Sequence, residues 1–215
     1  MRRLVLLSLL LAGCRPDPGV PDYSGMAALL DAGHDMNGVL PGPRPYVPGT
    51  RRLAFGIFYE GQASQVLAID DATRHYYVFE GTYTQQPSND RVEGLVSDQL
   101  TFVGNAWWGG GLVWDTPVDL SAWTTMYASF ASPDPHLDAL DLRMLSGAGA
   151  SPSSIPLPAS RYGWTNDGVW HSLAVPLADF ADAGVDLTKV RGPFVLGGVN
   201  AGSGETLLVD DVYFE

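Results

Sequence analysis

Short runs of residues that favour β-strands recur along residues 51–215, and this pattern limits the fold more than any other feature of the sequence. Gly, Pro, Asn and Asp separate the runs, as they do at turns between strands. Within Thr125–Ala131, the residues Met126, Ala128 and Phe130 alternate with more polar neighbours, which predicts a strand with one buried face. The pattern therefore predicts an all-β domain, an antiparallel β-sandwich or barrel. The runs are Leu53–Tyr59, Gln65–Ile69, His75–Phe79, Leu100–Val103, Leu112–Trp114, Thr125–Ala131, Ala139–Leu145, Val169–Val175, Phe194–Val199 and Thr206–Phe214.

Three of the six tryptophans lie within Gly104–Asp115, beside a glycine triplet. Trp107 and Trp108 are adjacent, so an extended backbone points their rings to opposite faces. We therefore expect one of them to pack in the core with Trp114 and the other to be exposed. The glycine triplet allows the chain to pass close to a neighbouring strand or to form a bulge. This segment is expected to be a structural corner with one exposed ring.

Residues 1–13 have the pattern of an export signal, with a positive start, an apolar run at Leu4–Leu11 and small residues before Cys14. The apolar run is shorter than the roughly 20 residues that span a bilayer. Leu-Ala-Gly-Cys resembles the bacterial lipoprotein signal, which implies that Cys14 is lipidated and anchors the protein in a membrane. Arg15, in place of an aspartate after the cysteine, favours the outer membrane. The alternative is a plain secretory signal with an incidental cysteine.

The remainder of the chain divides into a spacer and one domain. Residues 14–50 are rich in Pro and Gly, which predicts a flexible, partly extended tether behind the lipidated N-terminus. Residues 51–215 are long enough for a single domain with one core. Only Leu177–Ala183, after Pro176, has the pattern of a helical turn there.

The charge and cysteine content exclude several kinds of function. The chain has 12 basic and 24 acidic residues, a net charge of −12. Nucleic-acid binding depends on neutralising phosphates with Lys and Arg, so no nucleic-acid partner is expected. Cys14 is the only cysteine, and its lipidation would leave no thiol for a disulfide or for a cysteine-based metal site.

The second half of the chain resembles the carbohydrate-binding modules that have a galactose-binding-like β-jelly roll. Asp115–Trp123 is similar to the segment that leads into a core strand of such modules, Gly168–Phe180 to their penultimate strand and its short helical turn, and Leu207–Phe214 to their closing strand. The resemblance implies a jelly-roll β-sandwich, binding of a glycan, and in many members a structural calcium ion. It bears on fold more strongly than on function, because related sandwiches also serve as adhesive or structural units.

Aromatic and amide side chains provide the candidate glycan site. An indole ring stacks on the apolar face of a sugar, and neighbouring amides and carboxylates bind the hydroxyl groups. Loops on a rigid sandwich are a usual place for such a site, although the rings can also pack beneath the loop. Trp123 and Trp170 are expected in the core. The candidates are Trp107, Trp108, Tyr162, Trp164, Asn166 and Asp167.

Acidic residues near the two ends of the domain provide a candidate calcium site, because calcium prefers oxygen ligands. In the last strand at least one of two adjacent aspartates must face inward and needs a partner. The alternative is that these residues only cap exposed turns. The candidates are Asp70, Asp71, Glu80, Asp210 and Asp211.

Motifs for catalysis are absent from the sequence: it has no G-x-S-x-G, no H-E-x-x-H and no phosphate-binding glycine loop. We therefore expect a non-catalytic protein that requires no cofactor apart from the calcium considered above. The first hypothesis is a membrane-anchored lipoprotein that binds a polysaccharide or a cell-envelope glycan. The second is a structural or assembly lipoprotein that contacts another envelope protein. The third is a glycosidase or esterase, whose carboxylate pair the sequence alone does not exclude.

Overall fold

The computed structural model describes residues 46–56, 58–67, 69–70, 72–134, 136–137, 139–147 and 155–215. The predicted signal peptide, Cys14 and nearly all of the predicted tether lie outside the described residues. Within the described ranges, no helix is both long enough and apolar enough to cross a membrane.

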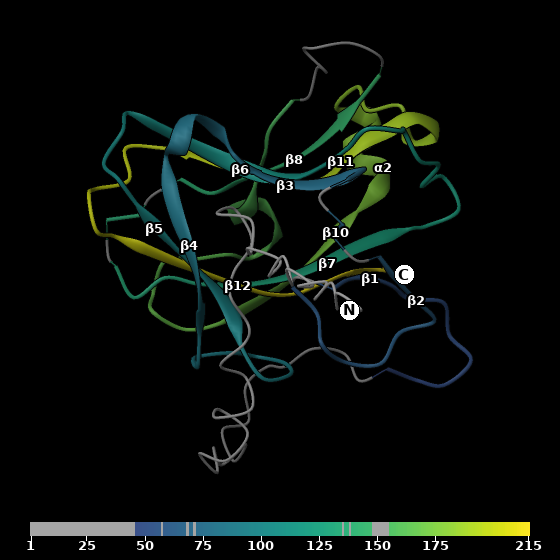
Figure 1. The fold of residues 1–215 in the computed structure, drawn as a ribbon, viewed down its shortest axis with the longest axis horizontal. Coiled ribbons are helices and arrows are strands. Elements are labelled where there is room, and N and C mark those ends of the chain that lie inside the picture. The colour runs from purple at the N-terminus through teal and green to yellow at the C-terminus, as the bar shows by residue number, and fades with distance from the viewer. Residues whose placement is uncertain are drawn as a thin grey trace, which may run out of the picture.

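Two β-sheets lie face to face (Figure 1). In the seven-stranded sheet the strand order is β10-β7-β12-β1-β2, and β5 pairs with β12 and carries β4 at its outer side. Its strands are β1 (Leu53–Phe55), β2 (Gln65–Leu67), β4 (Tyr83–Ser88), β5 (Ser97–Phe102), β7 (Thr125–Ala131), β10 (His171–Pro176) and β12 (Thr206–Phe214).

The five-stranded sheet has the order β3-β6-β11-β8-β9, and every neighbouring pair in it is antiparallel. Its strands are β3 (Arg74–Val78), β6 (Trp107–Trp114), β8 (Asp141–Ser146), β9 (Leu157–Pro158) and β11 (Val190–Val199). Among the described residues, four short helical segments join the strands: η2 (Phe79–Gly81), η3 (Ala159–Tyr162), α2 (Leu177–Asp182) and η4 (Leu187–Lys189). The predicted all-β sandwich and the predicted helical turn near Leu177 are confirmed, whereas the three 3-10 segments were not predicted.

The core fills the space between the two sheets. The predicted alternation in β7 is confirmed, because Met126, Ala128 and Phe130 are all buried in the main apolar cluster. Trp108 and Trp114 contribute large rings from β6 to the same cluster. The alternation of apolar and polar residues along strands such as β7 and β8 thus places one face of each sheet in the core.

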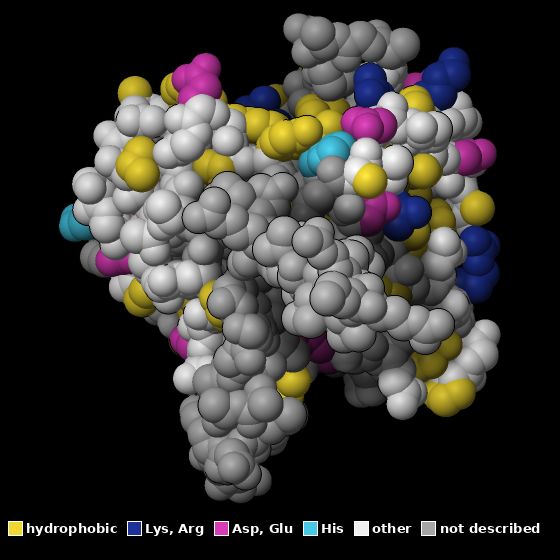
Figure 2. Space-filling model, in the orientation of Figure 1, with side chains coloured by type: hydrophobic (Ala, Val, Ile, Leu, Met, Phe, Trp, Pro, Cys, Tyr) yellow, Lys and Arg dark blue, Asp and Glu magenta, His cyan; other side chains and the backbone are white. Residues whose placement is uncertain are grey.

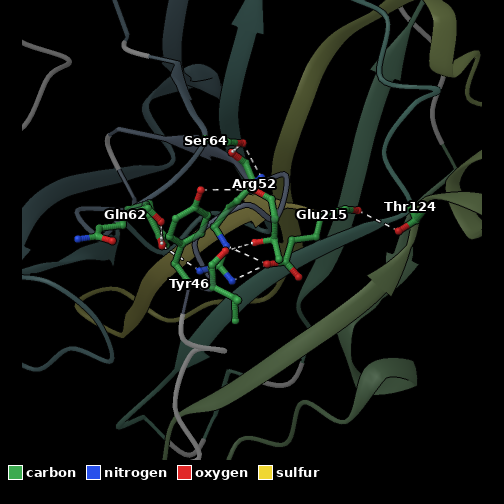
Figure 3. Close-up of polar contacts among 9 residues, drawn as sticks. Tyr46, Arg52, Gln62, Ser64, Thr124 and Glu215 are labelled. Atoms are coloured by element: carbon green, nitrogen blue, oxygen red, sulfur yellow. Dashed lines mark hydrogen bonds and ion pairs between the residues drawn. The ribbon is translucent and has the colours of Figure 1, made fainter.

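A partly buried ion pair joins Arg52, which directly precedes β1, to Glu215, which directly follows β12. Arg52 is 1% exposed, and its Nε donates to Oε1 of Glu215 at 2.9 Å. Its guanidinium also donates to the Tyr59 hydroxyl at 2.9 Å and lies over the Tyr213 ring at 3.9 Å. Figure 3 shows the Arg52 and Glu215 side chains pointing toward one another, with Thr124 bonded to the backbone carbonyl of Glu215.

Loops cover the outer face of the seven-stranded sheet. Leu208 and Ala131 on this face pack against Val92 and Trp170, which come from outside the central strands. The Trp170 indole donates to Oδ1 of Asp90 at 2.8 Å and so holds the segment that contains Val92 against the sheet. The covered part of this face lies over β7 and β12, whereas Ser172, Ala174 and Pro176 of β10 are exposed.

Candidate functional site

The outer face of the five-stranded sheet presents exposed aromatic rings on β3 and β6. Along β6 the side chains alternate, so that Trp107, Gly109 and Gly111 face outward while Trp108 and Leu112 face the core. Trp107 is 41% exposed, whereas Trp108 is 2% exposed. The expected division of the tryptophan pair is confirmed. The prediction that Trp108 is a candidate glycan-binding residue was wrong, because a ring packed in the core cannot contact a ligand.

The strand register brings three glycines together in the middle of this outer face. Gly109 pairs with Gly197 of β11, and Gly111 pairs with Val195 of β11 on one side and with Tyr77 of β3 on the other. None of the three glycines has a side chain, so backbone atoms form the floor here, and all three glycines are themselves buried. We call the surface formed by the following residues the glycine face. It consists of the floor Gly109, Gly111 and Gly197, the aromatic side His75, Tyr77 and Trp107, and the polar side Asp141 and Arg143.

The aromatic rings of the glycine face are held beside its floor. A methyl group placed on Gly109 would lie 3.6 Å from Cζ3 of Trp107 and 3.2 Å from Cδ2 of Phe79, so both rings border this glycine. Tyr77 is 47% exposed, and its ring lies 5.3 Å from the ring of His75. Figure 2 shows hydrophobic side chains and a histidine gathered over β3 and β6, with acidic and basic side chains next to them. This side of the face thus offers exposed aromatic surface for stacking.

The polar side of the glycine face lies on β8. Asp141 pairs with Gly197, and Arg143 pairs with Val195, which places both residues on the same outer face as the floor. The Arg143 guanidinium lies 3.7 Å from the Asp141 carboxylate. The face therefore combines exposed rings, a floor of glycines and one donor–acceptor pair.

The predicted loop site at residues 161–168 has a structural role for most of its members. Trp164 is 4% exposed and belongs to the core, so its assignment to a sugar-stacking surface was wrong. The Asn166 amide donates to the backbone carbonyls of Asp134 and Leu137 and ties two loops together. These side chains therefore hold the loop in place beneath its surface.

The two remaining members of that loop group are also bonded to protein partners. Tyr162 is half-buried and donates its hydroxyl to Asp179 at 2.7 Å, and burial raises the pKa of Tyr162 to about 12. Asp167 is exposed and accepts a hydrogen bond from His171, which lowers the pKa of Asp167. Neither residue lies on a strand of the glycine face.

Sequence reasoning missed Tyr77, Gly197, Asp141 and Arg143. The sequence did contain signals for three of these residues. Tyr77 lies in the predicted strand His75–Phe79, Asp141 and Arg143 lie in the predicted strand Ala139–Leu145, and alternate residues of a strand face outward. What was missing was the pairing that sets these residues on one face with Trp107.

The described residues of the predicted calcium set do not form one site. Asp70 is exposed and accepts backbone hydrogen bonds from Ala72, Thr73 and Arg74, which lower the pKa of Asp70 to about 2. Glu80 is exposed in η2, and Asp71 lies outside the described residues. Across the described ranges, no group of three or more His, Cys, Asp or Glu side chains is placed to hold a metal ion. Calcium binding stays a prediction from the resemblance.

Asp210 and Asp211 are instead a buried acidic pair within β12. The Asp210 carboxylate accepts backbone hydrogen bonds from Val92, Glu93 and Asp211 and so fixes the covering loop to the sheet. Asp211 has a left-handed backbone, with φ 57°, at a bulge in the pairing with β7. Its Oδ1 atom is buried and has no hydrogen-bond partner among the described residues.

Burial raises the pKa of both carboxyl groups. The pKa of Asp210 rises to about 7, despite the backbone donors that favour its charged form. The pKa of Asp211 rises to about 9, because burial is reinforced by the negative charges of Asp210 and Glu93. The pair therefore holds protons at pH values where exposed carboxyl groups have lost them.

Comparison with known proteins supports the fold. No family model and no curated protein matches the sequence. A family 30 carbohydrate-binding module of the cellulosomal cellulase Cel9D-Cel44B of Clostridium thermocellum superposes with a TM-score of 0.53 at 14% identity, over 66% of this chain and 91% of that module. A second family 30 carbohydrate-binding module gives a TM-score of 0.53 at 15% identity, over 65% of this chain and 80% of the other. This chain therefore has the jelly-roll β-sandwich fold of these modules.

Proposed function

We propose that the protein is a non-catalytic glycan-binding protein that holds a polysaccharide or cell-envelope glycan on the glycine face. The observation that carries this proposal is the presence of two exposed rings, Trp107 and Tyr77, beside the three-glycine floor. Sugar rings present apolar C–H surfaces that stack on aromatic side chains, and the floor glycines place no side chain of their own beside these rings. Over β7 and β12 the outer face of the other sheet is covered by its own loops, and the site is proposed on the face that has the exposed rings.

The structural neighbours agree with this proposal, since both superposing proteins are carbohydrate-binding modules by name. Their sequences are too distant for their binding residues to be transferred to this chain. The proposal therefore depends on the residues of the glycine face itself.

Glycan binding is tested by measuring the affinity of the full chain for a panel of soluble polysaccharides, by affinity electrophoresis and by calorimetry. We expect Trp107→Ala and Tyr77→Ala each to weaken binding about tenfold or more, because each removes one stacking surface. Gly197→Ala should also weaken binding, since its methyl group occupies the floor. That methyl group would lie 3.3 Å from the Trp108 carbonyl oxygen and 3.6 Å from Nε of Arg143, so the fold needs only a small adjustment.

Val169→Ala is the matched control, because Val169 is an exposed apolar residue on the loop before β10. It should bind as the wild type does. The proposal fails if the wild type binds no glycan of the panel, or if the Trp107→Ala, Tyr77→Ala double variant binds as tightly as the wild type.

We also propose that the domain is displayed from the outer membrane through a lipid on Cys14 and the tether at residues 14–50. The support is the lipoprotein-like Leu-Ala-Gly-Cys motif and the Pro/Gly-rich composition of the spacer. Cell fractionation tests it: Cys14→Ala should move the protein from the membrane fraction to a soluble one, because several acyl chains make attachment durable. A Cys14→Ala protein that stays in the membrane fraction would contradict the anchor.

A further inference from the structure

Asp141 and Arg143 on β8 are polar residues of the glycine face whose side chains form few polar interactions with the rest of the protein. Their side chains are 26% and 36% exposed, and the 3.7 Å between Nη2 of Arg143 and Oδ2 of Asp141 is longer than a hydrogen bond. Within the described part of the chain, neither side chain forms a hydrogen bond with any residue. Nε of Arg143 also lies 3.6 Å from the place a methyl group on Gly197 would take, so the side chain runs beside the floor.

Other arginines of the domain are engaged with the protein itself. Arg91 donates to the carbonyls of Asn89 and Gly94, and Arg191 donates to those of Trp114 and Asp115. Arg143 differs from these because its N–H donors lie on an open face beside a carboxylate. A structural role as a loop anchor does not account for it.

The chemistry of the pair matches hydroxyl groups. A guanidinium only donates hydrogen bonds, and an ionised carboxylate only accepts them. A sugar hydroxyl does both, so two neighbouring hydroxyls on one ring can donate to Asp141 and accept from Arg143. A carboxylated sugar fits less well, because Asp141 and the chain's net charge of −12 both repel it.

The position of the pair separates it from the aromatic side. Tyr77, Gly111, Val195 and Arg143 are level with one another across β3, β6, β11 and β8. Three steps between neighbouring strands span roughly 14 Å, which is longer than one sugar ring. A ring stacked at Tyr77 and a ring bonded at Arg143 must therefore be different members of one chain that crosses the strands.

We infer that Asp141 and Arg143 form the hydroxyl-binding end of the glycan site, so that the glycine face selects a neutral oligosaccharide long enough to reach from Tyr77 to β8. This inference rests on the proposed function, since it assigns roles within the same site. It adds that the glycan crosses the strands from β3 to β8, that it must be long enough to span this distance, and that uncharged sugars are preferred.

The test is calorimetry on the full chain with neutral oligosaccharides of increasing length, taken from a polysaccharide that the wild type binds. The wild type should bind more tightly as the oligosaccharide lengthens, until it spans the face. Asp141→Ala and Arg143→Ala should bind the shortest members as the wild type does and lose roughly tenfold in affinity for the longest. Lys189→Ala is the control, because it removes an equal charge from an exposed residue of η4 that pairs with Asp186.

The outcomes separate the two ideas. A wild type that binds no glycan refutes the proposed function, and the inference with it. Glycan binding that both alanine variants retain at every length refutes the inference alone. The inference is also overturned if the variants lose affinity for short and long oligosaccharides alike, or if the wild type prefers an acidic counterpart of the same length. Equal melting temperatures of wild type and variants exclude loss of fold as the cause of weaker binding.

Discussion

Replacing Arg52 with alanine is expected to lower the free energy of unfolding by about 3–5 kcal/mol. The guanidinium is buried, donates to Glu215 and Tyr59, and lies over the Tyr213 ring. Its removal leaves the Glu215 carboxylate without its cation and opens space beneath the first strand. Chemical denaturation measures the change. The midpoint denaturant concentration should fall, and the slope of the unfolding free energy against denaturant concentration should stay the same.

Arg74→Ala is the control for the loss of a charge. Arg74 forms an exposed ion pair with Asp70 at 3.8 Å, and pairs of this kind contribute about 0–1 kcal/mol. If Arg52→Ala is no more destabilising than Arg74→Ala, the ion pair between Arg52 and Glu215 contributes no more to stability than an exposed pair does.

The second large effect is on the pH dependence of stability. Asp210 and Asp211 have a raised pKa in the folded protein, about 7 and about 9, so the folded state binds more protons than the unfolded state between about pH 4 and pH 9. Stability must then fall as the pH rises through this window. We expect the free energy of unfolding, measured by denaturation in EDTA, to decrease by several kcal/mol from pH 5 to pH 9, with an upper bound of roughly 8 kcal/mol if both carboxyl groups titrate at these pKa values.

Asp211→Asn isolates the contribution of one carboxyl group. Asparagine tolerates the left-handed backbone at this position, so the change removes the charge without backbone strain. The variant should match the wild type near pH 5, exceed it in stability near pH 9, and show a flatter pH profile. A wild-type stability that rises from pH 5 to pH 9 would show that this pair is not the dominant titrating group.

The strands could be predicted where burial of one face imposes alternation, as in β7. Strand β4 (Tyr83–Ser88) was missed, because its run of Gln85, Gln86 and Pro87 has no such pattern. Its position beside only β5 explains how a proline is tolerated there. Strand β6 was underestimated: the sequence predicted Leu112–Trp114, but the strand continues back through the glycine triplet to Trp107.

The candidate site could be predicted only in part. Adjacency alone requires Trp107 and Trp108 to face opposite ways, and the structure assigns the exposed position to Trp107. The floor depends on the pairing of Gly109 with Gly197, which lie far apart in the sequence. Pairing between distant strands is set by the packing of the whole sandwich, so no local pattern reveals it. The sequence left open whether the Trp164 ring stacks on a sugar or packs beneath its loop, and in the structure it packs in the core.

The central claim, that the glycine face holds the glycan, is tested most directly by a nuclear magnetic resonance titration of the full chain with the polysaccharide fragment that binds best. Chemical shifts should change at the backbone amides of Gly109, Gly111 and Gly197 and at the indole N–H of Trp107. All four titration curves should fit one dissociation constant. Signals from the covered outer face of the seven-stranded sheet, such as the Trp170 indole, should stay unchanged. Shifts concentrated around Trp170, with the glycine amides unmoved, would contradict the claim.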